Sequence, residues 1–320
     1  MNDWMKAICW QCPERIPARV GILPAVWRKY REDLDRLLLR YPDLFPGHEI
    51  GKRDYDAPGR DSYREGEHID AWGCTWSNIQ EGMEAIVTGH PVPRREDINR
   101  LQPPAVDAGL PHGFFFLRLT DLRGFEEMML DFAEEPPELD QLIRIVRNYN
   151  LGQARKMATK TPNPEGYQYL GDDLGTQHAL PISPDAWRKH LKPGYAEVVG
   201  EFKRAGHNVY FHSDGCIWPI IPDLFECGID IVNPQVRANG LDQLEAVCRG
   251  KYPMSLDLDR QLFPFASPKE IDEHIEECIR RLATPKGGLW LSAEIGMDYP
   301  LENIDAICAS LVRHCKRSLS

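Results

Sequence analysis

The sequence predicts an α/β fold: a single (β/α)8 barrel over residues 1–320, with residues 1–18 as an N-terminal extension. Short β-rich runs alternate with longer segments of helical periodicity, which favours parallel strands joined by right-handed crossover helices. Eight such units close into a barrel that 320 residues can accommodate. An open nucleotide-binding sheet would be expected to carry a glycine-rich phosphate turn, and neither GxGxxG nor GxxxxGK[ST] occurs in the chain.

The predicted strands are short apolar runs between helical segments. Arg19–Leu23 is the first, and the helix that follows it has an apolar face of leucines. A polar stretch from about residue 48 to 70 is interpreted as a long loop, and Trp72–Ile79 as a strand or an excursion from the barrel. The remaining six predicted strands are Gly113–Leu119, Tyr167–Gly171, Asn208–Ser213, Asp230–Asn233, Met254–Leu258 and Leu289–Ala293.

The predicted helices carry clear start and stop signals. Ser267-Pro268 with Glu270 places a capping serine, a first-turn proline and an acid at the third position, and Ser183-Pro184 repeats the serine–proline start. Breaks are expected near Pro136-Pro137 and Pro193-Gly194. Two apolar stripes at helical spacing are Ile271, Ile275, Ile279 and Leu282, and Ile304, Ile307, Cys308, Leu311 and Val312.

The charge balance limits the partners that the chain can have. Asp and Glu number 49 against 38 Lys and Arg, a formal charge of −11, which argues against nucleic acid or an anionic membrane surface as a partner. No apolar run reaches the roughly 18 residues that span a membrane. The first residues lack the basic-then-apolar order of a signal peptide, so we expect a cytoplasmic protein.

Nine cysteines do not form a recognisable disulfide framework, because their number is odd and no export signal is seen. Cys9 and Cys12 form the one CxxC, the spacing of a redox or metal pair. A second CxxC is missing and Pro13 follows at once, so we interpret the pair as incidental and reduced. Cys278, Cys308 and Cys315 are interpreted as small buried side chains.

Polar side chains follow five consecutive predicted strands at the point where each strand ends. A single aspartate there is commonly a turn or a helix cap, but catalytic groups of barrels come from these same strand ends, so five in register predict a functional site. The polar residues at the strand ends are Asp172, Asp173, His212, Asp214, Asn233, Asp257, Asp259, Gln261 and Glu294.

His212 and Asp214 stand at positions i and i+2 of a strand, so their side chains point to the same face. With Glu294, three predicted strands further on, they form a candidate three-ligand site for zinc or another divalent metal. The same residues also suit metal-free catalysis, with Asp214 orienting His212 as an acid or base, or a purely structural hydrogen bond of His212.

The other candidates have catalytic and substrate-binding roles. Asp172 and Asp173 are candidate catalytic carboxylates, one of which would face the barrel mouth with a pKa raised by burial. Trp72, Trp76 and Trp218 could line a flat apolar pocket, although large aromatic side chains are more often core or loop anchors. The predicted substrate-binding residues are Trp72, Gln177, Asn233, Asp259 and Gln261.

Taken in order, these motifs resemble the uroporphyrinogen decarboxylase superfamily, which includes the decarboxylase itself and corrinoid-linked methyltransferases. The resemblance covers residues from about 70 to the C-terminus and is specific for the superfamily but not for one reaction within it. The matching motifs are Asp70-Ala71-Trp72-Gly73-Cys74, His90-Pro91, Gly171-Asp172-Asp173-Leu174-Gly175-Thr176-Gln177, His212-Ser213-Asp214-Gly215, Ile231-Val232-Asn233-Pro234, Asp259-Arg260-Gln261, Gly287-Gly288 and Pro300-Leu301-Glu302-Asn303.

Two departures from the family motifs bear on the reaction. The decarboxylase has an N-terminal Arg-Gln-Ala-Gly-Arg motif, whereas residues 24–31 here read Pro-Ala-Val-Trp-Arg-Lys-Tyr-Arg. Methyltransferases of the coenzyme M type bind zinc through His-x-Cys and a distant Cys. Here His212 is kept, while Asp214 and Glu294 stand at or near the two cysteine positions. Oxygen ligands leave zinc a stronger Lewis acid than thiolates do, which suits an oxygen substrate.

The resemblance therefore implies a metal-assisted methyltransferase. It would move a methyl group between a small, possibly methoxylated substrate and a corrinoid carried by a separate protein, because the chain has no room for a corrinoid domain beside one barrel. The alternative is a cofactor-free decarboxylase acting on uroporphyrinogen or a smaller acid. Asp172 or Asp173 would then stabilise a cationic intermediate, and Arg28 or Arg31 would bind the substrate carboxylate. A catalytically silent binding protein is the third interpretation.

Overall fold

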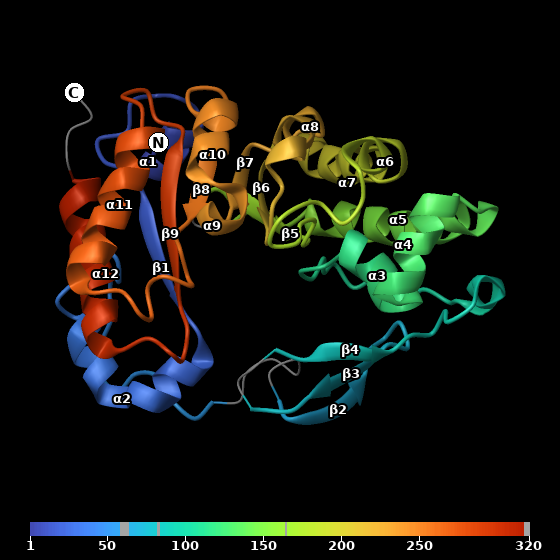
Figure 1. Cartoon of the computed structure of the whole chain (residues 1–320), viewed down its shortest axis with the longest axis horizontal. Coiled ribbons are helices and arrows are strands. Elements are labelled where there is room, and N and C mark those ends of the chain that lie inside the picture. The colour runs from blue at the N-terminus through green and yellow to red at the C-terminus, as the bar shows by residue number, and fades with distance from the viewer. Residues whose placement is uncertain (58–63, 82–83, 164, 317–320) are drawn as a thin grey trace. The chain divides into compact units, whose positions relative to one another are not determined.

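Six of the eight predicted strands are parallel strands in the structure, three in each of the two compact units into which the chain divides (Figure 1). The structure is a computed structural model that describes residues 1–57, 64–81, 84–163 and 165–316. Unit 1 comprises Met1–Arg64, Gln80–Glu84 and Gln235–Ser320, and unit 2 comprises Glu65–Ile79 and Ala85–Pro234.

The parallel strands of unit 1 lie in the order β1-β9-β8. They are β1 (Ala18–Ile22), β9 (Leu289–Ile295) and β8 (Met254–Asp257). In the register of the sheet Gly21 pairs with Glu294, and Asp257 pairs with Ser292. Asp257 and Glu294 therefore stand near the carboxyl ends of neighbouring strands.

The helices of unit 1 follow the predicted stripes. The cap of α11 is the predicted box, with Ser267 accepting from the backbone N–H of Glu270. Helices α11 and α12 are neighbours (Figure 1), and their predicted apolar stripes are buried except for Ile279 and Val312, which are partly buried. The extension over residues 1–18 holds α1, whose Trp4 meets Trp290 of β9 edge to face, 4.7 Å between ring centroids. The helices of this unit are α1 (Asp3–Ile8), α2 (Pro24–Leu38), α9 (Val236–Asn239), α10 (Leu241–Cys248), α11 (Pro268–Leu282) and α12 (Leu301–Cys315).

The parallel strands of unit 2 lie in the order β5-β6-β7. They are β5 (Tyr167–Gly171), β6 (Asn208–Ser213) and β7 (Ile231–Pro234). The register pairs Gly171 with His212, and His212 with Asn233. These three positions therefore stand at one level across the ends of the three strands, which brings their polar neighbours together.

The predicted strand Gly113–Leu119 is wrong, because residues 113–115 form a turn and helix α3 begins at Phe116. The apolar run Phe114–Leu117 ends in the first turn of α3, and a distant carboxylate caps the start of this helix. Asp172 accepts from the backbone N–H groups of Phe115, Phe116 and Leu117 at 3.0, 2.6 and 3.0 Å, which satisfies donors that a helix start leaves open.

Trp72–Ile79, expected to be a strand or an excursion from the barrel, contains an antiparallel strand and contributes none to the parallel sheets. Strand β3 (Thr75–Asn78) lies between β2 (Gly66–Ile69) and β4 (Ile86–Gly89) in a three-stranded sheet. The loop expected from about residue 48 ends where β2 begins, and residues 58–63 of it lie outside the described residues. The α/β class is thus confirmed, while a closed eight-stranded barrel stays a prediction.

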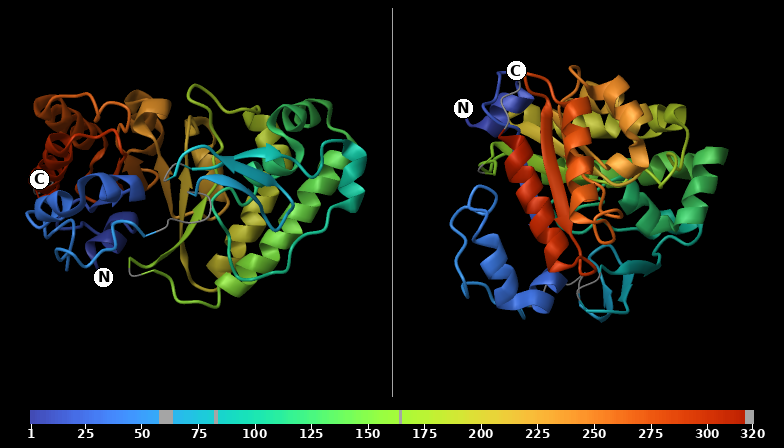
Figure 2. Two further views of the ribbon diagram at one scale, coloured as in Figure 1. Left: turned by 90° about the horizontal axis from the view of Figure 1, so that it is seen from below. Right: turned by 60° about the vertical axis from the view of Figure 1, so that its left-hand side comes forward.

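The helices of unit 2 respect the predicted proline breaks. One helix ends at Glu134 and the next begins at Pro137; another ends at His190 and Pro193 falls in the first turn of its successor, where a missing N–H costs little. Helices α5 and α7 lie side by side (Figure 2, left). The helices are η2 (Arg95–Arg100), α3 (Phe116–Arg123), α4 (Phe125–Glu134), α5 (Pro137–Met157), α6 (Pro184–His190), α7 (Lys192–Arg204), η3 (Trp218–Ile220) and α8 (Ile221–Glu226).

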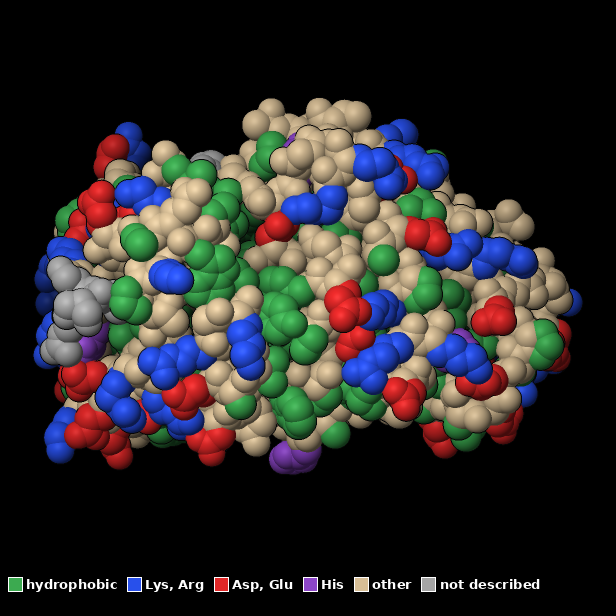
Figure 3. Space-filling view, turned by 90° about the horizontal axis from the view of Figure 1, so that it is seen from above, with side chains coloured by type: hydrophobic (Ala, Val, Ile, Leu, Met, Phe, Trp, Pro, Cys, Tyr) green, Lys and Arg blue, Asp and Glu red, His purple; other side chains and the backbone are tan. Residues whose placement is uncertain are grey.

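The surface and the cysteines agree with the composition. Positive and negative side chains alternate over the face shown in Figure 3, so the net charge of −11 is not concentrated there. No disulfide joins the nine cysteines; Cys9 and Cys12 are exposed and the other seven are buried, as predicted for Cys278, Cys308 and Cys315. No helix in the described part of the chain is long and apolar enough to cross a membrane.

Candidate functional site

Four of the predicted site residues lie together in unit 2, at the carboxyl ends of β5, β6 and β7. Asp173 follows β5, Asp214 follows β6, and His212 and Asn233 lie within the last residues of β6 and β7. Asp214 donates its backbone N–H to Asp173 Oδ1 at 2.8 Å, which ties the two loops together. Parallel strands bring these residues to one edge of a sheet, as the sequence predicted.

His212 is held by a polar partner at each ring nitrogen. Its Nδ1 lies 2.7 Å from Asn233 Oδ1, a contact that is satisfied when Nδ1 carries the proton, and its Nε2 lies 3.2 Å from Asp214 Oδ1. Burial lowers the pKa of His212, but the hydrogen bond and charge of Asp214 and the charge of Asp173 outweigh it, so the pKa of His212 is raised. Asn233, predicted to bind substrate, orients this histidine.

His112 completes the cluster, and the sequence prediction missed it. Its Nε2 lies 3.1 Å from Asp173 Oδ2, and its ring centroid lies 5.5 Å from that of His212. The ring lies over Gly171, where a Cβ would approach His112 Nδ1 to 2.5 Å, so only glycine fits. The one signal was a histidine in the Pro111-His112-Gly113 turn, directly before a segment that was taken for a strand.

The electrostatics of His112 favour its cationic form. Burial lowers the pKa of His112, but the hydrogen bond and charge of Asp173, with the charges of Asp172 and Asp214, raise it to about 9. His112 and His212 are therefore two imidazoles facing two carboxylates within one small cluster. Such a cluster can donate or accept a proton, or exchange its protons for a metal ion.

The donor atoms of this cluster can converge on a metal. One ligand atom each of His112, Asp173 and His212 lie within 4.8 Å of one another, and no other group of three or more His, Cys, Asp or Glu in the described ranges meets this condition. Two imidazole nitrogens and a carboxylate oxygen, with a position left open, are a donor set that catalytic zinc accepts. The residues present therefore fit a divalent metal.

Asp172, predicted to be catalytic, is fully buried and holds helix α3 in place. Besides the three N–H groups at the start of α3, it accepts from the Tyr195 hydroxyl at 2.5 Å. Burial raises the pKa of Asp172, against the lowering effect of these hydrogen bonds. Because the carboxylate of Asp172 is occupied by the start of α3 and by Tyr195, we interpret it as structural. Asp173 is the member of the pair that faces the histidines.

The carboxylates at the strand ends of unit 1 are paired with arginines. Arg260 lies 2.6 Å from Asp257 Oδ2 and 2.7 Å from Glu294 Oε1. Arg237 lies 2.7 Å from Asp259 Oδ1, which also accepts from the backbone N–H of Gln261 at 3.0 Å. Glu294, the predicted third metal ligand, is thus engaged by a guanidinium within its own unit.

Trp72 lines a cavity of about 480 Å³ in unit 2, together with Phe114, Arg118 and Tyr149. Trp72 meets Tyr149 edge to face at 4.9 Å between ring centroids, and of the three tryptophans predicted to line a pocket only Trp72 lines this cavity. Trp76 instead donates its Nε1–H to Asp70 at 3.1 Å. Gln177, predicted to contact substrate, is exposed in the loop after β5.

Arg118 lies between two carboxylates whose pKa values shift in opposite directions. Its Nη1 is 2.6 Å from Asp70 Oδ2, and despite burial, which raises it, the pKa of Asp70 is lowered by this guanidinium and by further hydrogen bonds. The nearest contact to Asp121 is 3.9 Å, so burial dominates and raises the pKa of Asp121 to about 7.

Three comparisons place the chain among known proteins. The model of a family described as Uroporphyrinogen decarboxylase (URO-D) matches residues 119–314, more than half of the chain. No curated protein matches the sequence significantly. A methyltransferase from Methanosarcina mazei shares the fold, with a TM-score of 0.62 and 18% identity over 97% of both chains.

Two further solved structures give lower scores. A sugar phosphate isomerase/epimerase from Parabacteroides distasonis has a TM-score of 0.37 and 12% identity over 95% of this chain and 96% of that chain. Dihydropteroate synthase from Yersinia pestis has a TM-score of 0.32 and 18% identity over 55% of this chain and 60% of that chain.

Proposed function

The chain belongs to the uroporphyrinogen decarboxylase family, and on that premise we propose that it is a metal-assisted methyltransferase. It moves a methyl group between a small, methoxylated substrate and a corrinoid carried by a separate protein. The observation that carries the proposal is the cluster of His112, Asp173, His212 and Asp214 at the strand ends of unit 2. The fold shared with a methyltransferase from Methanosarcina mazei supports it.

The side chains of the cluster have separate roles. His112, Asp173 and His212 hold the metal, and Asn233 fixes His212 by its contact with Nδ1, which leaves Nε2 for the site. When bound, a divalent metal supplies a Lewis acid for an ether oxygen. When the bond between the methyl carbon and oxygen breaks, the methyl group passes to the corrinoid and the electron pair stays on oxygen, which needs a nearby positive charge or a proton. A divalent ion held by the cluster would supply that charge. In the metal-free alternative, the imidazolium of His112 or His212 would donate the proton.

Asp214 and Glu294 were the other predicted metal ligands. Asp214 Oδ1 lies 3.2 Å from His212 Nε2, close enough to join a metal site or to orient the histidine. Glu294 pairs with Arg260 at 2.7 Å in unit 1, so it could ligate only by giving up that contact. We therefore propose His112, Asp173 and His212 as the principal ligands and test Glu294 by replacement.

The decisive experiment is metal content together with a cobalamin spectral titration. Purified protein should contain about one equivalent of a divalent metal, and His212→Ala and Asp173→Ala should lose it. The exposed His178→Ala is the matched control and should keep it. Glu294→Gln separates the two ligand sets, since metal lost in this variant would restore Glu294 as a ligand. Absence of metal from every wild-type preparation, even after reconstitution with zinc, would refute the proposed metal site.

A spectral change of cobalamin that requires the chain and a methoxylated compound would support methyl transfer. Methyl transfer that persists in the presence of a chelator would instead support metal-free acid–base catalysis by the same histidines.

The second candidate is a cofactor-free decarboxylase, which the description of the matching family favours. Asp173 would stabilise a cationic intermediate. The arginines expected to grip the substrate are already paired, Arg28 with Glu81 at 3.1 Å and Arg31 with Asp56 at 2.9 Å, which ranks this candidate second. Release of carbon dioxide from uroporphyrinogen, unaffected by chelator, would place it first.

A further inference from the structure

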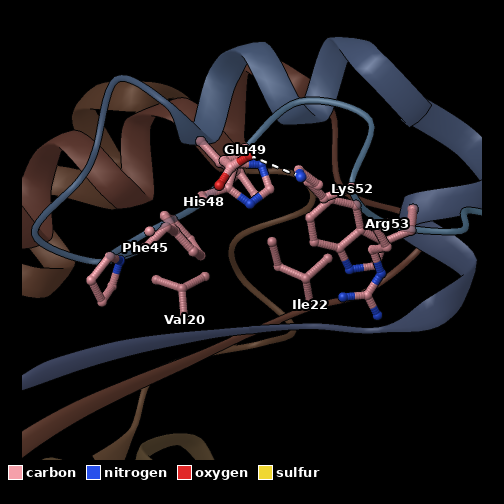
Figure 4. A pocket seen from close by; sticks show the side chains of 11 residues that line it. Val20, Ile22, Phe45, His48, Glu49, Lys52 and Arg53 are labelled. Atoms are coloured by element: carbon pink, nitrogen blue, oxygen red, sulfur yellow. Dashed lines mark ion pairs between the residues drawn. The ribbon is translucent and has the colours of Figure 1, made fainter.

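We propose that unit 1 carries a separate binding site for a small organic carboxylate with an apolar body. The site is a cavity of about 490 Å³ between β1 and the loop over residues 45–53 (Figure 4). This volume is in the range of small-molecule pockets. No residue of the histidine–carboxylate cluster lines it, so it is distinct from the site of the proposed methyl transfer.

One wall of the cavity is apolar. Val20 and Ile22 stand at i and i+2 of β1, so both point to one face of the strand, toward Phe45 and His48 of the loop (Figure 4). Both are only partly buried, although they belong to a strand that pairs with β9. Covering apolar surface of this kind with the hydrocarbon body of a ligand stabilises the complex by about 25 cal/mol per Å².

The loop that forms the opposite wall is pinned by a buried carboxylate. Asp35 of helix α2 is fully buried and accepts from the backbone N–H of Gly51 at 2.9 Å and from the Tyr55 hydroxyl. His48 Nε2 lies 2.9 Å from its other oxygen. Because the wall is fixed before a ligand arrives, binding does not have to order it.

Two polar groups of the cavity, in Arg53 and Trp27, have no acceptor among the described residues. The guanidinium of Arg53 stacks on the Trp27 ring, 4.4 Å from its centroid, and no carboxylate of the described residues pairs with it. The indole Nε1 of Trp27 has no hydrogen-bond partner among the described residues, although only 5% of that side chain is exposed. Because Nε1 of Trp27 is itself inaccessible to solvent, the exposed guanidinium of Arg53 is the cationic group that a ligand oxygen can reach.

The remaining charges select the kind of anion. Lys52 and Glu49 pair at 3.5 Å, as Figure 4 shows, but both are largely exposed, so this weak pair adds little net charge. The exposed guanidinium of Arg53 matches the two oxygens of a carboxylate, because guanidinium binds carboxylates in a planar, bidentate way. The adjacent Glu49 disfavours a dianion such as phosphate ester.

The test is a ligand-observed NMR titration of the full chain with benzoate, benzyl alcohol and inorganic phosphate. We expect benzoate to bind with a Kd of about 1 mM or tighter, and the two other probes at least about tenfold more weakly. Arg53→Gln should weaken benzoate binding about tenfold. Trp27→Phe, which changes the ring on which Arg53 stacks, should also weaken it. Arg36→Gln, which removes an exposed arginine from α2, and His212→Ala, which alters unit 2, should leave it unchanged.

Several results would overturn the proposal. No benzoate binding by the wild-type chain would do so, as would equal binding of benzyl alcohol or of phosphate. Loss of binding in His212→Ala with retention in Arg53→Gln would assign the ligand to unit 2. Because Trp27 is buried, its variant is checked by thermal unfolding; Arg53 is exposed, so Arg53→Gln keeps the test valid even if Trp27→Phe is destabilised.

Discussion

The carboxylates at the strand ends of unit 2 face imidazoles, whereas those of unit 1 face guanidinium groups. Asp173 and Asp214 contact His112 and His212 at 3.1 and 3.2 Å. Asp257 and Glu294 instead share Arg260, at 2.6 and 2.7 Å. The two sets have the same type of residue at the same kind of position, the end of a parallel strand.

The difference lies in what the cation can do. An imidazole can give up its proton and then become a metal ligand, while a guanidinium stays charged and cannot ligate. The carboxylates of unit 2 can therefore take part in proton transfer or metal binding, and those of unit 1 are neutralised by a permanent charge. The partner of each acid thus decides its chemistry.

The largest expected effect is on turnover. His212→Gln should lower the rate of the proposed methyl transfer by about 10²–10⁴-fold, because it removes the ionisable group that Asn233 and Asp214 position. Glu294→Gln should change the rate by less than about tenfold, since its partner is Arg260. Rates from the corrinoid spectral assay check both variants. An equal loss of rate in Glu294→Gln would contradict the difference between the two sets of carboxylates and would assign Glu294 to the same reaction as His212.

The next largest effect is a difference in the free energy of unfolding between variants of the neighbours Asp172 and Asp173. Asp172→Ala leaves three backbone N–H groups and the Tyr195 hydroxyl without their acceptor, so the free energy of unfolding should fall by about 3–5 kcal/mol. Asp173→Ala should cost only about 1 kcal/mol while impairing catalysis. Urea unfolding measures both. Equal costs would contradict the structural role of Asp172.

A pH titration of stability tests what happens when a buried carboxylate is poorly paired. The folded-state pKa of Asp121, about 7, lies above its ordinary value of 3.8. The folded state therefore holds this proton more tightly, and the stabilisation is complete below about pH 4 and lost as the pH rises through 7. We expect Asp121 to lower the free energy of unfolding by roughly 1–3 kcal/mol between pH 4 and pH 8.

Urea unfolding of the wild type and Asp121→Asn at several pH values checks this, because the variant should lack that loss. Asp70→Asn is the control, because the pH dependence of the stability that Asp70 contributes should have the opposite sign. The pKa of Asp70 is lowered, so its stabilisation is present above pH 4 and lost as the pH falls below it. A parallel pH dependence of the two variants would refute the assignment.

The smallest effect is expected in unit 1. Glu294 is 41% exposed, so its pair with Arg260 is screened by solvent, and Glu294→Gln should change the free energy of unfolding by less than about 1 kcal/mol. Denaturant unfolding at low and high salt measures it. A cost near that of Asp172→Ala would show that this pair is a buried, structural one.

Local sequence patterns predicted a large part of the fold. The parallel strands at residues 167–171 and 208–213 and the cap at Ser267 were identified from apolar runs and turn chemistry alone. The strand at Gly113–Leu119 failed, because the capping acid of that helix, Asp172, lies 56 residues from Phe116 in the sequence. A run of three phenylalanines looks the same in a strand and in a buried helix.

The candidate site was predicted only in part, for a similar reason. His212 and Asp214 share a strand end, so their proximity follows from strand geometry. His112 lies in a turn before a helix, and nothing near it in the sequence indicates that it packs over Gly171 and reaches Asp173.

The sequence by itself determined the α/β class, six parallel strands and the presence of polar residues at their ends. These properties depend on the periodicity and polarity of residues a few positions apart, so they can be read without knowing the rest of the chain. Only the tertiary structure decided that Asp172 is a buried cap, that Asp173 faces His112, and that Glu294 faces Arg260. Burial and the charge of the nearest partner fix those roles, and both come from residues that are distant in the sequence.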